Sequence, residues 1–167
     1  MKKLLLASLS AVFLAGGMFA FVYLIGNADP AAPKFNPEAH ADWPSYPFEQ
    51  LLSRTDVVAL VTVSKTDKNP RPMDDRIPSQ LATLQVKQVL YGTAPSEVVL
   101  DQAVEYAKPG ETYVMFLTKH GDYYYEVDGN SKLLNTNGII RSNIPDLKGD
   151  FTVDQFAAQL KQAIPKK

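Results

Sequence analysis

The stretch that decides the fold is "TYVMFLTKHGDYYYEV", residues 112–127, in which two apolar runs flank a His-Gly pair. The β-branched and aromatic residues of both runs are typical of strands. A short polar pair between two such runs indicates a tight turn, and both of these residues tolerate positive φ. The segment is therefore predicted to be a β-hairpin that turns at His120-Gly121, which would place Leu117 opposite Tyr124.

Residues that oppose each other in a hairpin lie on the same face of the sheet. One face would then carry Val114, Phe116, Tyr125 and Val127, and the other Met115, Leu117 and Tyr124 with Glu126 at its edge. Both faces are apolar, and each apolar face of a sheet has to be buried against another layer. We expect the interior of a barrel to cover one face and a helix to cover the other.

Three consecutive tyrosines begin the second strand of this hairpin. In one interpretation they are wall and core, with Tyr123, nearest the turn, the most exposed. In the other, Tyr123 and Tyr124 form an exposed platform for a glycan or a peptide, close to the polar residues Asp128 and Asn130. These four residues are the candidate ligand-binding residues of the sequence.

The segment "DGNSKLLNTNG", residues 128–138, begins like a calcium-binding loop. Asp128 and Asn130 would supply oxygen ligands at positions 1 and 3. Position 6 is Leu133 where the loop needs glycine, and position 12 is Ile139 where it needs glutamate. The sequence therefore predicts a polar loop here, and it predicts neither a metal ion nor a cofactor for the protein.

Four further runs have the composition of strands and are bounded by turn-forming residues. They are "DVVALVTVSK" (56–65), "QLATLQVKQVLYG" (80–92), "SEVVLDQ" (96–102) and "NGIIRS" (137–142). The alternation of apolar and polar residues in the second run is broken at Val89-Leu90. This break predicts a bulge near Gln88, which would curve the sheet.

A short helix is predicted before the first strand. Ser45 is its expected N-cap, with Pro47 in the first turn. Phe48, Leu51 and Leu52 then fall on one apolar face at helical spacing.

A second helix is predicted at the end of the chain, in "FTVDQFAAQLKQAI", where Thr152 and Gln155 form a capping box. The resulting order is a short helix, about six strands and a helix, without alternating strand–helix units. The predicted fold is therefore mainly β, a small antiparallel barrel of five to six strands with two flanking helices.

The first residues predict a membrane anchor. Leu4–Ile25 contains no charge over 22 residues, and a helix of that length spans about 33 Å, enough for the hydrocarbon core of a bilayer. Lys2 and Lys3 precede this run, which keeps the N-terminus in the cytoplasm and the rest of the chain outside. The alternative is a signal peptide cleaved near residues 26–28, after which the protein would be secreted.

The segment after the anchor is rich in proline, which favours an extended linker. The predicted organisation is an anchor or signal peptide over residues 1–26, a linker over 27–47 and an extracytoplasmic β-domain over 48–167. Without Lys2 and Lys3 the chain has 15 basic and 18 acidic residues, so nucleic acid is not an expected partner. The chain has no cysteine, which excludes disulfides and thiolate chemistry.

The segments "RTDVVALVTVSK", "ATLQVKQVLYGTAPSEVVLDQ" and "KPGETYVMFLTKHGDYYYEV" resemble a recurrent exported bacterial β-domain. Over Thr55 to Val127 the layout is similar to the OB-like barrels of the netrin and tissue-inhibitor-of-metalloproteinase superfamily. The resemblance implies a barrel outside the cell membrane. Those inhibitors act through an N-terminal cysteine, which this chain lacks, so neither their activity nor any functional residue carries over.

The leading hypothesis is a membrane-tethered binding protein, held by residues 4–25, whose outer domain takes a protein, a peptide or an envelope polymer. One alternative is a structural or sensory accessory subunit of a membrane complex, in which Gly16-Gly17 permits close packing of the anchor helix.

The other alternative is a small envelope hydrolase or metal-dependent enzyme. It would use Asp74, Asp75, His120 and Asp128, provided that the fold brings them together in one cleft. The sequence contains none of the familiar runs of serine hydrolases, zinc proteases or phosphate-binding loops.

Overall fold

The computed structural model describes residues 44–70, 79–103 and 105–164. All described residues belong to one compact unit, Ala41–Lys167. The predicted anchor at residues 4–25 and the Asp74-Asp75 pair lie outside the described residues. Within the described ranges, no helix has the length and apolar character needed to cross a membrane.

Two helices and eight strands make up the described domain. In chain order they are α2 (Phe48–Ser53), β1 (Val57–Lys68), β2 (Gln80–Gly92), β3 (Glu97–Gln102), β4 (Thr112–His120), β5 (Tyr123–Glu126), β6 (Lys132–Thr136), β7 (Ile139–Ser142), β8 (Gly149–Thr152) and α3 (Val153–Ala163).

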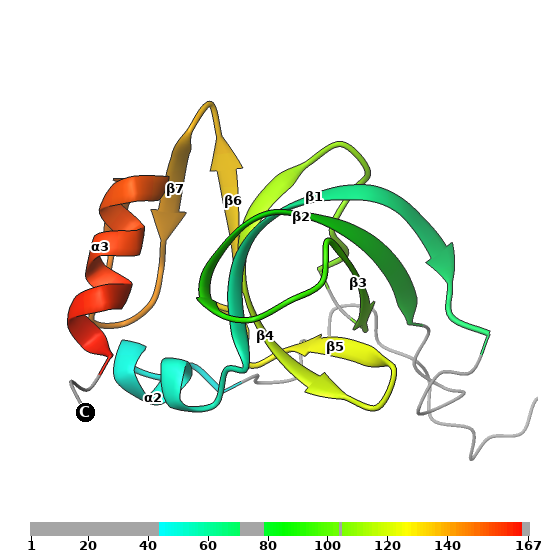
Figure 1. Cartoon of the computed structure of the whole chain (residues 1–167), viewed down its shortest axis with the longest axis horizontal. Coiled ribbons are helices and arrows are strands. Elements are labelled where there is room, and N and C mark those ends of the chain that lie inside the picture. The colour runs from blue at the N-terminus through cyan, green and yellow to red at the C-terminus, as the bar shows by residue number, and fades with distance from the viewer. Residues whose placement is uncertain (1–43, 71–78, 104, 165–167) are drawn as a thin grey trace, which may run out of the picture. The chain divides into compact units, whose positions relative to one another are not determined.

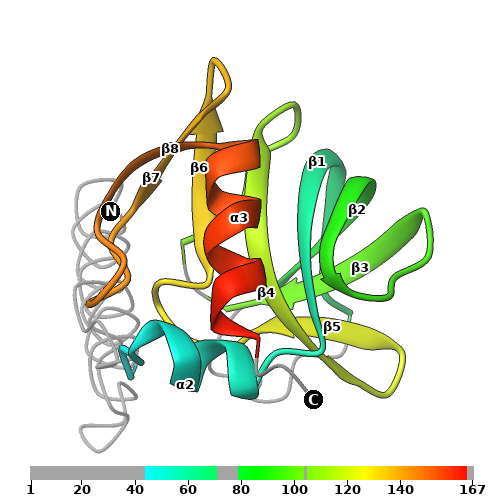
Figure 2. The same ribbon diagram turned by 60° about the vertical axis from the view of Figure 1, so that its left-hand side comes forward.

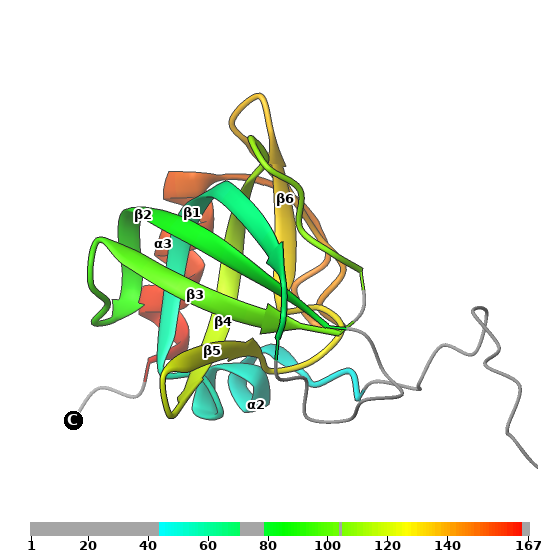
Figure 3. The ribbon, with the colours of Figure 1, turned by 90° about the vertical axis from the view of Figure 1, so that its right-hand side faces the viewer.

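The first five strands form a closed barrel, as the sequence predicts. Their order is β1-β2-β3-β5-β4, and β4 pairs back onto β1 from Val57↔Leu117 to Thr62↔Thr112. Every neighbouring pair in the barrel is antiparallel except β3 and β5, which run parallel where Leu100 meets Tyr124. Figure 3 shows β1, β2 and β3 side by side as they bend around the barrel.

The bend in β1 and β2 comes from irregular pairing. Between Val58 and Val61 of β1, the register with β2 skips Leu90 and then Lys87. The predicted bulge near Gln88 is thus confirmed, with one skipped residue on each side of it. At the end of β2, a Cβ on Gly92 would lie 2.0 Å from the backbone oxygen of Asp56, so only glycine fits against the start of β1.

The hairpin of β4 and β5 forms, but its predicted turn was wrong. The turn residues are Gly121 and Asp122, and Lys119, not Leu117, lies opposite Tyr124. Gly121 has a φ of 61°, which is what the first position of such a two-residue turn demands. The partner of Tyr124 on β4 is thus displaced by two residues from the predicted one. Because side chains alternate between the faces with a period of two, each side chain still lies on the predicted face.

The strand β4 separates two hydrophobic cores, as its two apolar faces predict. One core fills the barrel and includes Met115, Leu117 and Tyr124. The other lies outside the barrel wall, where Phe116 makes edge-on contacts with Phe48 of α2 and Phe156 of α3, with ring centroids 6.2 and 6.1 Å apart. Figures 1 and 2 show α2 and α3 on this side of the barrel.

The start of α2 differs from the prediction. Its N-cap residue is Pro47 and not Ser45, and no side chain of the cap accepts a hydrogen bond. Instead, the backbone N–H of Phe48 donates to Oδ1 of Asp146, 98 residues further along the chain, at 2.7 Å. A distant loop therefore supplies the cap. The predicted capping box of α3, from Thr152 and Gln155, is confirmed.

Three strands extend the sheet beyond the barrel. β6 pairs with β4, β7 with β6 and β8 with β7, all antiparallel. Figure 1 shows the hairpin of β6 and β7 projecting past the barrel. The predicted strand at residues 137–142 corresponds to β7, whereas the prediction of a polar loop over residues 128–138 was wrong, because Lys132–Thr136 pairs on both sides.

Candidate binding groove

The two faces of the β6–β7–β8 extension have different environments. Successive residues of a strand point to opposite faces, so Leu133 and Ile140 enter the second core while Leu134 and Ile139 face away from it. Leu134 is 44% exposed and Ile139 is 43% exposed. Thr136 pairs with Ile139 and lies two residues from Leu134, so both aliphatic side chains share one face of the sheet.

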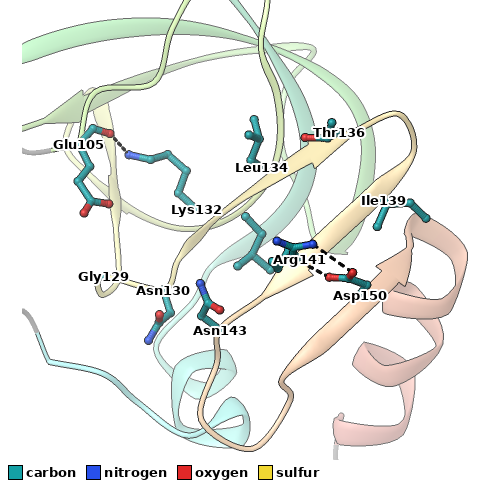
Figure 4. Close-up of a pocket in the computed structure, with 11 residues that line it drawn as sticks. Glu105, Gly129, Asn130, Lys132, Leu134, Thr136, Ile139, Arg141, Asn143 and Asp150 are labelled. Atoms are coloured by element: carbon teal, nitrogen blue, oxygen red, sulfur yellow. Dashed lines mark hydrogen bonds and ion pairs between the residues drawn. The ribbon is translucent and has the colours of Figure 1, made fainter.

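This face is the floor of a groove with a volume of about 600 Å³. Glu105, from the segment between β3 and β4, lines one side, and Arg141 and Asp150 line the other (Figure 4). Asn130 and Asn143 add side-chain amides to the lining. The groove thus combines an apolar floor with a polar rim, the usual anatomy of a surface that binds a partner.

An exposed ion pair crosses the outer strands of the groove. Arg141 Nε lies 3.0 Å from Oδ1 of Asp150, and Nη2 lies 3.4 Å from Oδ2. Both side chains are more than half exposed, so the pair adds little to stability. Its hydrogen bonds still lower the pKa of Asp150 and raise the pKa of Arg141, so both groups remain charged over a wide pH range.

A buried ion pair lies at the inner end of the groove. Lys132 Nζ is 2.9 Å from Oε1 of Glu126, and each side chain is only 8% exposed. Lys132 lies opposite Met115 and Glu126 opposite Leu117, so both side chains point to the barrel side of the sheet. Burial raises the pKa of Glu126, and the charge of Lys132 opposes that shift.

Lys132 also fixes one wall of the groove. Its ammonium group donates to the backbone oxygen of Glu105 (Figure 4), a residue with a φ of 49°, which is uncommon for any residue but glycine. The bond therefore ties β6 to the segment that follows β3.

Asp128, a predicted ligand-binding residue, is fully buried. Its carboxylate accepts hydrogen bonds from the backbone N–H of Tyr46, from the backbone N–H of Asn130 and from the hydroxyl of Ser131, at 2.8–2.9 Å. These bonds hold the chain before α2 against the β5–β6 turn. Asn130 does line the groove, and its amide donates to Ser45 Oγ at 2.6 Å.

The predicted tyrosine platform does not form. Tyr123 and Tyr124 are neighbours in β5 and therefore point to opposite faces of the sheet. Tyr124 is 7% exposed and packs in the barrel core, with Lys119 Nζ 5.9 Å from the centre of its ring, while Tyr123 is half-buried on the outer face. Tyr124 also borders a hollow at the barrel mouth, beside Asp56 and Pro95.

The groups of the enzyme hypothesis do not meet within the described part of the chain. His120 precedes β5 at the hairpin tip, whereas Asp128 is buried beyond the other end of the strand. Asp74 and Asp75 lie outside the described residues. Across the described ranges, no three histidine or acidic side chains gather as metal ligands would.

Sequence reasoning missed most of the groove, although it named Asn130. The missed residues include Glu105, Leu134, Ile139, Arg141 and Asp150. One usable signal was the apolar doublets in "KLLNT" and "IIRS", because two adjacent aliphatic residues on a strand place one on each face. Where only one face of the sheet is covered by a core, such a doublet therefore leaves one aliphatic side chain exposed.

Comparison with known proteins gives no relative: no family model, no curated protein and no solved structure matches the chain.

Proposed function

We propose that this chain is a membrane-tethered binding protein of the extracytoplasmic space, and that the groove on β6, β7 and β8 receives its partner. The observation that carries the proposal is the pair of exposed aliphatic residues, Leu134 and Ile139, on the floor of the groove. Exposed apolar side chains grouped in a concave surface favour association with a partner. Each Å² of apolar surface that the partner removes from water contributes about 25 cal/mol to the free energy of binding.

The topology supports an OB-like barrel as the scaffold of this function. Five strands in the order β1-β2-β3-β5-β4, closed by β4 on β1, follow the Greek-key barrel of that class. The resemblance of Thr55–Val127 to exported OB-like domains points the same way. The three-strand extension is an addition to the barrel, and it is the extension that bears the groove.

The test is photo-crosslinking from the groove in the full chain, in the membrane of the cells that make it. A benzophenone amino acid is placed at Ile139 and, as a control, at Val89, which is 37% exposed on β2. We expect a defined adduct from Ile139 that disappears when Leu134→Asp is added. Equal adducts from both positions, or an adduct indifferent to Leu134→Asp, would refute binding in the groove.

The membrane part of the proposal needs its own measurement. Residues 4–25 would hold the protein in the membrane with the domain outside, since Lys2 and Lys3 favour a cytoplasmic N-terminus. Protease added to intact spheroplasts should then degrade the domain, and the mature N-terminus should be Met1. A domain protected until the membrane is broken would contradict the proposed orientation, and an N-terminus near Asp29 would replace the anchor by a cleaved signal peptide.

A further inference from the structure

In the part of the chain that the structure describes, some of the charged side chains that line the groove have a partner of opposite charge, and one does not. Lys132 is paired with the buried Glu126, and Arg141 is paired with Asp150. Glu105 differs, because Lys132 reaches its backbone oxygen and not its carboxylate (Figure 4). Among the described residues, no ion pair or hydrogen bond involves the carboxylate of Glu105. One side of the groove therefore offers a carboxylate to a cation from outside.

The positions along β6 give the order in which Glu105 and the apolar floor follow one another along the groove. Lys132, which contacts Glu105, and Leu134 are two residues apart on the same face of the strand. Thr136, two residues further, lies beside Ile139 of β7. The groove thus presents Glu105, held through its backbone oxygen beside Lys132, and then two aliphatic side chains that follow the two-residue repeat of an extended strand.

We propose that the groove binds an extended peptide segment of a partner protein in which a basic side chain is followed, at two-residue intervals, by two aliphatic side chains. This inference rests on the function proposed above and names its ligand. The basic side chain meets Glu105, and the aliphatic side chains cover Leu134 and Ile139. Asn130, Asn143 and Thr136 supply donors and acceptors for the peptide backbone.

The experiment uses the purified full chain in detergent micelles and three peptides with blocked ends. The basic probe is Gly-Lys-Gly-Leu-Gly-Leu-Gly with a fluorophore at one end, and the matched probes carry glutamine or glutamate in place of lysine. Affinity is measured by fluorescence anisotropy at low and high salt. Methyl chemical shifts of Leu134 and Ile139 report whether a bound probe occupies the groove.

The protein variants are Glu105→Gln and, as a matched control, Glu49→Gln on the exposed face of α2. We expect the basic probe to shift both methyl groups and to lose about three- to fivefold in affinity with Glu105→Gln, the range of a partly exposed ion pair. Glu49→Gln should leave the affinity unchanged. High salt should weaken binding of the basic probe to the native protein but not to Glu105→Gln.

Three outcomes would overturn the inference: a glutamate probe that binds as tightly as the lysine probe, an affinity that Glu105→Gln leaves unchanged, or groove methyl groups that the basic probe does not shift. If any of these is found while crosslinking at Ile139 still gives an adduct sensitive to Leu134→Asp, the groove binds a ligand of another class. An adduct of twice the chain's mass would identify a second copy as the occupant. Loss of that crosslink as well would end both proposals.

Discussion

The barrel and its extension are parts of one sheet, yet the same side of that sheet is buried in one and exposed in the other. Leu117 on β4 points into the barrel and is fully buried. Leu134 on β6 faces the same side, since it pairs with Tyr113 of the barrel core, but it is 44% exposed. The difference is closure. Strands β1 to β5 curl over their inner face, whereas β6 to β8 stay open.

The largest expected effect comes from breaking the wall that both regions share. Phe116 is fully buried and contacts the rings of Phe48 and Phe156. Phe116→Ala should lower the free energy of unfolding by about 3–5 kcal/mol, through lost burial and the cavity that remains. Urea denaturation measures this loss. A loss below about 1 kcal/mol would mean that the second core does not depend on the ring.

The junction between barrel and groove depends on Lys132. Lys132→Met should cost about 3 kcal/mol, because it leaves Glu126 buried without its cation and removes the bond to the backbone oxygen of Glu105. Adding Glu126→Met should restore most of the stability, since no buried charge then remains. The double-mutant cycle is measured by urea denaturation, and strictly additive losses would contradict the coupling.

The pH dependence of the free energy of unfolding tests the charge state of Glu126 at this junction. Burial raises the pKa of Glu126 above its ordinary value of 4.5. A carboxyl group whose pKa is raised in the folded state binds its proton more tightly in the folded than in the unfolded protein. Protonation therefore stabilises the fold at a pH below the ordinary pKa, and this stabilisation is lost as the pH rises through the folded pKa. We therefore expect the stability of the native protein relative to Glu126→Gln to fall as the pH rises above about 4.5 toward neutrality.

Parallel urea titrations of the two proteins at several pH values give this difference directly. Lys132, Glu105 and Asp128 also act on Glu126, so the difference between the two proteins reports the titration of Glu126 together with its coupling to these three groups. A difference that grows as the pH rises would reverse the assigned direction of the pKa shift.

A smaller effect is expected at the helix that covers the second core. Thr152 caps α3 by accepting a hydrogen bond from the backbone N–H of Gln155 at 3.2 Å. Thr152→Ala should cost about 1 kcal/mol, while Thr152→Ser, which keeps the hydroxyl, should cost less. Thermal unfolding compares the two, and equal losses would show that the hydroxyl does not cap the helix.

The smallest effect is expected on the open face. The Arg141–Asp150 pair is largely exposed, so Arg141→Ala should leave the urea midpoint unchanged. Lys132→Met serves as the buried counterpart in the same assay. A clear loss of stability with Arg141→Ala would mean that the groove face contributes to the fold of the domain and is not simply available to a partner.

Much of the fold was readable from residue patterns because local periodicity reports burial. The two apolar faces of β4, the broken alternation near Gln88 and the box of Thr152 and Gln155 each predicted a feature that formed. The cap of α2 could not be predicted, because its acceptor, Asp146, is distant in sequence. β6 was missed because a five-residue strand has little periodicity and its polar neighbours resemble a loop.

The groove was harder to predict than the fold. Asn130 was named for its polarity, but Leu134 and Ile139 look like any core residues in the sequence. Whether such a residue is covered depends on what lies across from it, and that depends on how the sheet closes. Glu105 could not be assigned either, since its place in the groove follows from a bond to Lys132, 27 residues away.

The sequence alone determined the alternation of each long strand, the helical faces, the lack of thiol chemistry and the charge-free run at residues 4–25, because each is a property of neighbouring residues. Only the tertiary structure decided that β3 and β5 meet in parallel within the barrel, that Lys132 meets Glu126, and that one face of the extension stays open. Those outcomes depend on contacts between residues far apart in the chain. Small differences in strand register and sheet curvature decide which of these residues come into contact.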